Sequence, residues 1–334
     1  MAEKSNIQWT DASYNPWRGC TKVAPGCKFC YAESNMSVKL HGVKWGPRGT
    51  RVRSSDSYWN QPKKWDKVAK MEGVRKKVFC ASLADVFEEW NGPITTHKNE
   101  VLWKDKKGVY ADAEKSGFQP YEIATMDHLR ADLFKVIDET PNLDWLLLTK
   151  RPQNIRKMWA PMAPIIMKRD LEHRPFFHTG MEDMRYITPY RRNVWLGCSV
   201  SEQETFEDSY EALLDCAELG SVLFLSYEPS LGPIDLRAFL EAPTPSKKWV
   251  IVGGESSQGG NKGRRFDLSW ARSVISQCKK AKVPCFVKQL GADVTDGPLD
   301  INEPNGKLRA ISLSDSHGGN MEQWPEDIRV REFP

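Results

Sequence analysis

The chain has 334 residues, of which 40% are hydrophobic and 28% charged, and its formal net charge is +4. This length and composition suffice for a large buried core, as one α/β domain or as two smaller domains. No apolar run approaches the ~18 residues of a membrane span, and the eight cysteines are too sparse for a disulfide framework. We therefore expect a soluble, cytoplasmic protein with no membrane partner.

A short predicted first strand is followed by three cysteines, Cys20, Cys27 and Cys30. Pro25 and Gly26 favour a turn between the first two, and the Cys27-x-x-Cys30 spacing lets two thiolates of one loop reach one metal centre. Three thiolates can hold three irons of a [4Fe–4S] cluster and leave the fourth iron open for a cofactor. The loop therefore predicts a cofactor site with these three cysteines as metal ligands.

Two other interpretations of the cysteines stay open. A Cys-x-x-Cys pair is also half of a zinc site, for which His41 could supply a further ligand, although His41 lies on the far side of a predicted helix. The cysteines could also form a redox pair or carry no ligand at all.

The segment from Lys39 to Lys77 is strongly basic, with twelve Lys or Arg and three Asp or Glu. It interleaves cations, which neutralise phosphates, with aromatic rings, which stack on bases. This pattern predicts binding of DNA or RNA, and the alternative is a solvated loop anchored to the core by its tryptophans. The predicted contacts are Lys44, Trp45, Arg48, Arg51, Arg53, Trp59, Lys63 and Lys64.

Short, nearly continuous apolar runs recur along the rest of the chain, which is typical of parallel strands covered on both faces. They cover residues 77–83, 144–149, 193–199, 221–226, 249–253 and 284–288. Amphipathic helices are predicted between them, over 129–137 and over 206–217, the second opened by a Ser201-x-x-Glu204 capping box. Alternating strands and helices predict an α/β fold, a partial (β/α) barrel of six or seven parallel strands.

We expect the barrel to span residues 1–297, with insertions near 91–120 and 160–192, and a tail over 298–334 that docks on the barrel through Trp324. The carboxyl ends of parallel strands meet at one rim, where the cysteine loop should also lie. The polar rim residues singled out are Lys150, Arg151, Ser199, Glu228, Gly253, Gly254 and Glu255.

Five further segments carry a family resemblance: Asn15–Cys20, Leu147–Pro152, Leu225–Pro233, Gly253–Ser256 and Glu322–Pro334. With the cysteine loop, its following helix and Phe29 before the last cysteine, they resemble the phage-associated three-Cys-motif family, which is similar to radical S-adenosylmethionine (SAM) enzymes. The match runs from near residue 7 to the end of the chain. The commonest radical SAM pattern has three residues where this chain has six between its first two cysteines.

The resemblance implies a [4Fe–4S] cluster, SAM, and an electron donor such as flavodoxin or ferredoxin. The reduced cluster would cleave SAM, and the resulting 5′-deoxyadenosyl radical would take a hydrogen from a substrate, for which we favour a nucleic acid or nucleotide to be modified or repaired. The alternatives are the same chemistry on a small metabolite or peptide, and a non-enzymatic zinc protein that binds nucleic acid.

Within that scheme the rim residues have candidate roles, each with a structural alternative. Lys150 or Arg151 could hold the SAM carboxylate or a substrate phosphate, or simply be solvated. Gly253, Gly254 and Glu255 could meet the methionine end of SAM or form a turn with a surface acid. Ser199 could bind the ribose, and Glu228 could be a polar anchor or a salt-bridge partner. Phe29 belongs to the cluster loop, and Cys198 could donate a hydrogen atom or fill the core.

Overall fold

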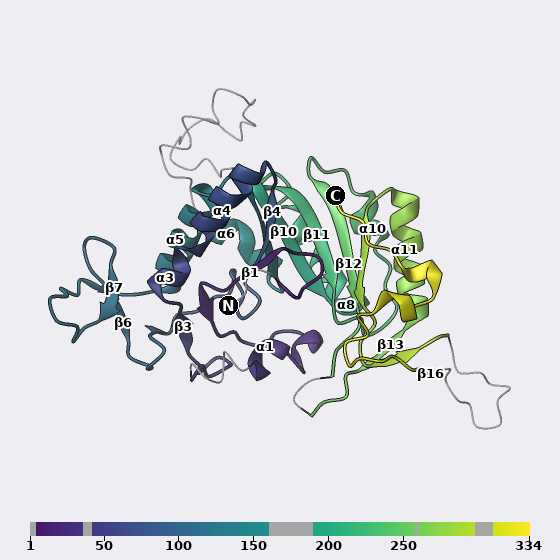
Figure 1. The fold of residues 1–334 in the computed structure, drawn as a ribbon, viewed down its shortest axis with the longest axis horizontal. Helices are drawn as coiled ribbons and strands as arrows, with labels where there is room; N and C mark the ends of the chain where they lie inside the picture. Colours follow the sequence, from purple (N-terminus) through teal and green to yellow (C-terminus); the bar gives the residue numbers. More distant parts are fainter. Residues whose placement is uncertain (1–4, 36–41, 160–189, 258–259, 298–309) are drawn as a thin grey trace.

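The computed structural model describes the chain except residues 1–4, 36–41, 160–189, 258–259 and 298–309. Its centre is a seven-stranded sheet in the order β1-β4-β9-β10-β11-β12-β14, in which every pair of neighbours is parallel. The sheet curls into a half-barrel (Figure 1). The strands are β1 (Ala12–Tyr14), β4 (Lys76–Cys80), β9 (Leu143–Thr149), β10 (Arg191–Val200), β11 (Gly220–Tyr227), β12 (Lys247–Gly253) and β14 (Cys285–Gln289). The predicted parallel α/β sheet is confirmed, with all seven strands.

Successive residues of each strand face opposite sides of the sheet, and the two sides have separate apolar clusters. On one side, strand residues such as Leu147, Leu196 and Leu225 share a cluster with helix residues. The helices include α4 (Gln61–Glu72), α5 (Met126–Asp138), α6 (Ile155–Met158), α8 (Gln203–Glu207), α9 (Tyr210–Leu214), α10 (Arg237–Glu241) and α11 (Leu268–Ala281). Burial of both faces explains why the strands read as nearly continuous apolar runs.

The other side of the sheet is filled by aromatic rings. Trp249 lies at the centre, with ring centroids 5.9 Å from Trp195, 5.9 Å from Phe224 and 6.0 Å from Phe286. Trp9 closes this cluster against Phe79, at 4.7 Å. Polar residues lie further along the same strands than this aromatic cluster. They form the rim at the carboxyl ends of the strands.

The helix boundaries follow local capping chemistry. Thr125 caps α5 by accepting a hydrogen bond from the backbone N–H of His128, and Asp267 caps α11 by accepting one from Ser269. The residue that caps α8 is Glu202, paired with Thr205, and Ser201 is buried one position earlier. The expectation that Ser201 opens this helix is therefore wrong by one residue, and the predicted helix over 206–217 is two short helices, α8 and α9.

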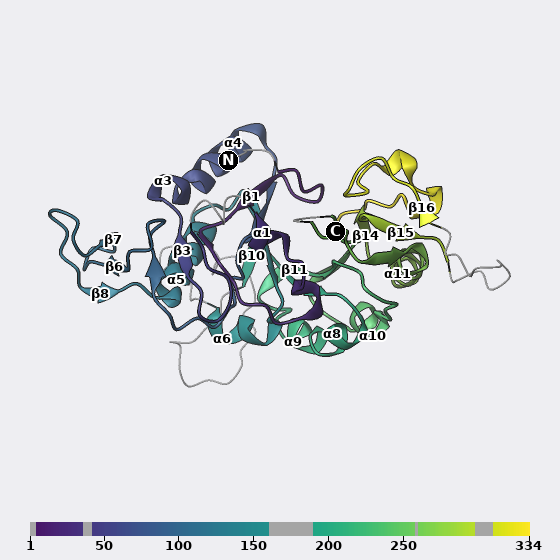
Figure 2. The ribbon, with the colours of Figure 1, turned by 90° about the horizontal axis from the view of Figure 1, so that it is seen from below.

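Three small sheets surround the half-barrel, together with two short helices, α1 (Tyr31–Ser34) and α3 (Asp56–Trp59). One of these sheets falls largely in the predicted insertion near 91–120 and projects away from the main sheet (Figures 1 and 2). The expected insertion near 160–192 lies almost wholly outside the described residues. The small sheets are formed by β2 (Trp17–Arg18), β3 (Arg51–Arg53) and β5 (Ile94–Thr95); by β6 (Leu102–Lys104), β7 (Tyr110–Asp112) and β8 (Glu122–Ile123); and by β13 (Arg265–Asp267), β15 (Asp293–Thr295) and β16 (Ala310–Ile311).

The C-terminal segment packs on the main sheet. Trp324 is only 2% exposed and its indole N–H donates to the carbonyl of Gly318 at 3.0 Å. Further on, the backbone N–H of Val287 donates to Val330, and that of Glu332 donates to Cys285. Two single turns of 3₁₀ helix, Met321–Gln323 and Glu326–Ile328, shape this segment.

Across the described ranges, no helix combines the length and the apolar character that crossing a membrane requires.

Candidate functional site

Polar side chains stand above the aromatic cluster at the carboxyl rim of the half-barrel. Ser199 lies four residues beyond Trp195 in β10, and Ser226 lies two beyond Phe224 in β11, so each shares the face of the aromatic residue that precedes it. Gly253 lies four residues beyond Trp249 in β12 and shares its face of the sheet. The polar rim predicted from the sequence is therefore formed on the inner face of the curled sheet.

The cysteine loop is pressed onto this rim. Pro25–Cys27 forms a turn of 3₁₀ helix, and Cys30 immediately precedes α1. A Cβ atom placed on Gly26 would lie 2.3 Å from Oγ of Ser201 and 3.4 Å from Cδ of Pro229, so only glycine allows this approach. The loop thus contacts the segments that follow β10 and β11.

Arg264 fixes the same loop from the side of β12. Its Nη1 donates to the carbonyl of Pro25 at 3.0 Å, and its guanidinium lies 5.3 Å from the ring centroid of Phe29. Glu255 holds this guanidinium in a two-pronged ion pair, at 2.8 Å to Nε and 2.6 Å to Nη2. Glu255 therefore acts through Arg264 on the cysteine loop, and Phe29 packs against the same cation.

The first cysteine is held separately by Arg151. Nη1 of Arg151 lies 3.8 Å from Sγ of Cys20 and 2.7 Å from Asp85, and its Nη2 donates to the carbonyl of Thr21 at 2.7 Å. Glu88 lies 3.6 Å from the same guanidinium. Burial opposes the charge of Arg151, but Asp85, Cys20 and Glu88 outweigh it and raise its pKa. Arg151 therefore stays positively charged beside the thiol of Cys20.

Burial changes the ionisation of Cys20 and of Cys30. Burial raises the pKa of Cys20 to about 12, with Asp85 and Glu88 adding to the increase and Arg151 opposing it. Burial also raises the pKa of Cys30, and Cys27 adds to this, while backbone hydrogen bonds and Lys150 act in the opposite direction. Cys20 and Cys30 are therefore protonated at neutral pH, and a metal that binds them must displace those protons.

Cys27 contributes to the raised pKa of Cys30, whereas the thiol of Cys20 contacts Arg151 and donates to the carbonyl of Thr21 at 3.5 Å. Within the described ranges, no three His, Cys, Asp or Glu side chains are grouped so that they could hold a metal ion. The donor set has the thiol chemistry that an iron–sulfur cluster requires, but the three sulfurs do not meet at one point. His41 lies outside the described residues.

A chain of polar contacts crosses the rim from β9 to β14. Lys150 contacts Oγ of Ser199, and Ser199 donates to the carbonyl of Glu228 at 3.1 Å. Glu228 accepts from Ser226 at 3.1 Å and pairs with Lys288 at 2.9 Å. The rim thus presents two cations and one carboxylate beside the cysteine loop.

Two glycines allow the backbone to come close to its neighbours here. A Cβ on Gly253 would lie 2.6 Å from Oε1 of Glu228, and one on Gly254 would lie 1.9 Å from the carbonyl of Leu290. Gly254 also accepts a hydrogen bond from Gln289 at 3.0 Å. Both glycines serve close packing of the chain at the end of β12.

Cys198 is fully buried in β10, and burial raises its pKa to about 12. Its Sγ lies 3.9 Å from the carbonyl of Ser199. Cys198 packs in the cluster between the sheet and its helices, on the face of β10 opposite Ser199.

The residues predicted to bind nucleic acid fall into two groups. Arg51 is buried and makes two 2.7 Å hydrogen bonds to Glu88, Arg53 pairs with Asp56, and Trp59 is 6% exposed. The other group consists of cations on the surface and one half-buried aromatic residue: Lys44, Arg48, Lys63, Lys64 and Trp45.

The turn that carries Lys44 and Arg48 adjoins the cysteine loop. The backbone N–H of Gly46 donates to the carbonyl of Cys20 at 2.9 Å, and Trp45 packs in a small apolar cluster that includes Cys30. Lys63 lies on α4 and pairs with Glu139. The structure therefore brings one part of the basic segment next to the cysteines and leaves the other on a helix.

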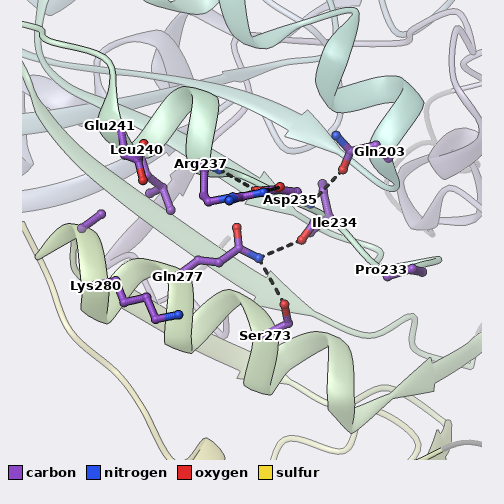
Figure 3. A pocket seen from close by; sticks show the side chains of 11 residues that line it. Gln203, Pro233, Ile234, Asp235, Arg237, Leu240, Glu241, Ser273, Gln277 and Lys280 are labelled. Atoms are coloured by element: carbon purple, nitrogen blue, oxygen red, sulfur yellow. Dashed lines mark hydrogen bonds and ion pairs between the residues drawn. The ribbon is translucent and has the colours of Figure 1, made fainter.

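A cavity of about 580 Å³ lies between α10 and α11 and contains none of the residues predicted from the sequence. Its polar groups bind one another: Gln277 bonds to Ile234 and Ser273, and Arg237 pairs with Asp235 (Figure 3). Because these polar groups are already paired with one another, the cavity does not favour one class of ligand.

The sequence did not indicate two contacts of the site. Arg264 belongs to no motif, and its contact with Pro25 joins positions 239 residues apart. Nothing in the sequence indicated that Asp85 would hold Arg151 and, through Arg151, Cys20.

Comparison with known proteins identifies a family. A family model described as a protein of unknown function, DUF5131, matches residues 4–96 and 95–321. No curated protein and no solved structure matches the chain.

This match corrects the resemblance drawn from the motifs. The matching family is uncharacterised, and neither a radical SAM family nor the three-Cys-motif family matches. The metal-binding group that such a family would bring is also missing from the described part of the chain. The assignment to the phage-associated three-Cys-motif family is therefore wrong, and the motifs carry no family function to this chain.

Proposed function

The chain belongs to the DUF5131 family of proteins of unknown function, and we propose from its rim that it is an enzyme that holds a [4Fe–4S] cluster on Cys20, Cys27 and Cys30 and uses SAM as its co-substrate. The observation that supports this most is the seating of the cysteine loop on a polar parallel-strand rim, through Gly26 against Ser201. Three sulfur ligands would leave one iron open to SAM. When bound, the reduced cluster would supply the electron that breaks a carbon–sulfur bond of SAM.

The rim offers groups suited to an amino acid ligand. Lys150 is a cation near Cys30, as its effect on the pKa of that thiol indicates, and a cation there would neutralise a carboxylate. Glu228, paired with Lys288, would accept from an ammonium group. Ser199 supplies a hydroxyl between them.

The chain also limits access to the cysteines. Cys30 shares a small apolar cluster with Leu83, Val43 and Trp45. Arg264 holds the loop through its hydrogen bond to Pro25. Cluster binding would require the three sulfurs to come together, because within the described residues they do not form a metal-binding group as they stand. It would also require Cys20 and Cys30 to lose their protons.

For the substrate we propose a nucleic acid or nucleotide, supported by Lys44 and Arg48 on the turn that adjoins the loop. Cations placed there would bind phosphates beside the reacting centre. An electron donor such as flavodoxin or ferredoxin would be a further partner.

The test is anaerobic reconstitution with iron and sulfide, followed by metal analysis and addition of dithionite and SAM. We expect about four irons per chain and release of 5′-deoxyadenosine. Alanine at Cys20, Cys27 or Cys30 should abolish both, whereas Cys216→Ala, a buried cysteine beyond α9, should retain both.

Other outcomes would reject the proposal. One zinc per chain without iron would indicate a structural metal site. Full iron binding after loss of Cys27 or Cys30 would show that the ligands lie elsewhere.

A further inference from the structure

A second cavity, of about 510 Å³, is lined by residues of β2, β3 and α3 and of the segments that flank them. Two arginines line it, together with hydroxyl-bearing side chains and one histidine: Arg18, Arg53, Ser55, Ser57, Thr96 and His97. None of these residues belongs to the cysteine loop or the rim described above. The cavity thus combines guanidinium and hydroxyl donors, which are the groups that bind phosphate oxygens.

Arg53 is fixed in place by aromatic rings. Its guanidinium lies 5.0 Å from the ring centroid of Trp59 and 4.6 Å from that of Tyr110. Nη1 donates to Asp56 at 2.6 Å, while Nε is buried and has no hydrogen-bond partner among the described residues. A buried donor without a partner is costly, and an anionic oxygen would satisfy it.

Arg18 is fixed by the hydroxyl of Ser54. Its Nη1 donates to Ser54 at 3.0 Å, and that hydroxyl donates in turn to the carbonyl of Asn15 at 2.6 Å. Arg18 is 3% exposed, and burial lowers its pKa, with Tyr58 opposing the shift. The guanidinium is therefore held rigidly in an environment that strengthens its attraction for an anion.

The charges that line the cavity favour an anion. Besides Arg18 and Arg53, the ionisable lining residues are Asp56, Tyr58 and His97. Asp56 is the one carboxylate, and its side chain is 71% exposed, so it neutralises one of the two guanidiniums from the solvent side. An incoming anion would compete with Asp56 for Arg53.

We propose that this cavity binds a phosphate group through Arg18 and Arg53, with the Ser57 hydroxyl as a further donor. Two rigid guanidiniums suit the tetrahedral arrangement of phosphate oxygens better than a single planar carboxylate. Binding needs neither a cluster nor SAM, so the site stands independently of the proposed enzymatic function. The phosphate group belongs either to a small phosphate compound or to the phosphodiester backbone of a polynucleotide.

Isothermal titration calorimetry of the full chain with inorganic phosphate, adenosine monophosphate and a single-stranded oligonucleotide tests the proposal. We expect saturable binding of at least one probe. Phosphate and the mononucleotide alone would indicate a small-molecule site, and binding of the oligonucleotide alone would indicate a polynucleotide site. No binding of any probe at millimolar concentration would overturn the proposal.

Variants assign binding to the cavity. Arg53→Gln should weaken binding at least tenfold, and Arg237→Gln, an arginine of the other cavity, should leave it unchanged. Asp56→Asn removes the competing carboxylate and should tighten binding severalfold, which a merely structural role of this exposed residue would not produce. Ser57→Ala provides an exposed, conservative second variant, expected to weaken binding about threefold, should Arg53→Gln fail to fold. Equal affinity of wild type, Asp56→Asn and Ser57→Ala would place the phosphate elsewhere and reject the site.

Discussion

Arg264 donates a hydrogen bond from Nη1 to the carbonyl of Pro25, at 3.0 Å, and thereby joins the end of the half-barrel to the cysteine loop. The same guanidinium is held by Glu255, which is 9% exposed. The geometry of the loop therefore depends on an ion pair contributed by a distant part of the chain.

Replacing Arg264 by Gln should loosen this loop. A charged hydrogen bond contributes about 1.5–3 kcal/mol, so the alkylation of Cys27 and Cys30 in metal-free protein should become about tenfold faster or more. Mass spectrometry of iodoacetamide-treated protein measures the rates. The matched control is Arg265→Gln, whose ion pair with Asp293 is 4.0 Å long and exposed. Equal rates in both variants would show that Arg264 does not hold the loop.

Arg51 and Arg48 should respond differently to substitution. Arg51 and Glu88 form an ion pair whose side chains are 0% and 2% exposed, so Arg51→Met should lower the free energy of unfolding by about 3–5 kcal/mol. Arg48 is exposed, and Arg48→Gln should change stability by less than about 0.5 kcal/mol. Urea denaturation measures both values. If Arg48 contacts phosphate, its variant should also lower the salt dependence of oligonucleotide binding, by about 0.7 in log–log slope for a single strand.

The raised pKa of Cys198 predicts that the folded protein loses stability at alkaline pH. Its pKa is about 12 in the folded protein and 9.0 in its ordinary state, so the folded state keeps a proton that the unfolded chain releases. The stabilisation is complete below pH 9 and is lost as the pH rises toward 12, by about 1.4 kcal/mol at pH 10. Urea denaturation under reducing conditions at pH 8 and pH 10 should show a smaller decrease for Cys198→Ala than for wild type. An identical decrease would contradict the raised pKa.

Trp324 should be the main anchor of the C-terminal segment. It is 2% exposed, and its indole is bonded to Gly318, so Trp324→Ala should cost about 3–5 kcal/mol of unfolding free energy. Thermal and urea denaturation measure the change. Met71→Ala, at a side chain 87% exposed, serves as the control and should be nearly neutral. A cost below about 1 kcal/mol would show that the segment is not held by this residue.

Much of the main sheet could be predicted from the sequence, since strands buried on both faces must be apolar throughout. The runs at 144–149 and 249–253 coincide with β9 and β12 within two residues. The placement of Lys150 and Ser199 at one rim followed from the same parallel arrangement, and they contact one another. These features depend on short-range pattern and on topology alone.

Contacts between distant residues could not be predicted. The basic segment reads as exposed charge, but Glu88, 37 residues away, neutralises Arg51, and Arg53 packs against the ring of Tyr110. Likewise, the thiol spacing indicated a shared metal centre, while the fold places Arg151, 131 residues away, beside Cys20. Spacing along the chain says which side chains can meet, and tertiary packing decides which of them do.

The half-barrel does not close on itself, so β14 is an edge strand whose backbone groups would be open to pairing with another chain. The final residues bind those groups. The backbone N–H of Val287 donates to the carbonyl of Val330, the carbonyl of Cys285 accepts from the backbone N–H of Glu332, and Phe286 forms an antiparallel β-bridge with Arg331. The C-terminal residues thus prevent another chain from adding a strand at this edge of the sheet. A chain shortened before Val330 would expose this template and should self-associate at concentrations where the full chain does not.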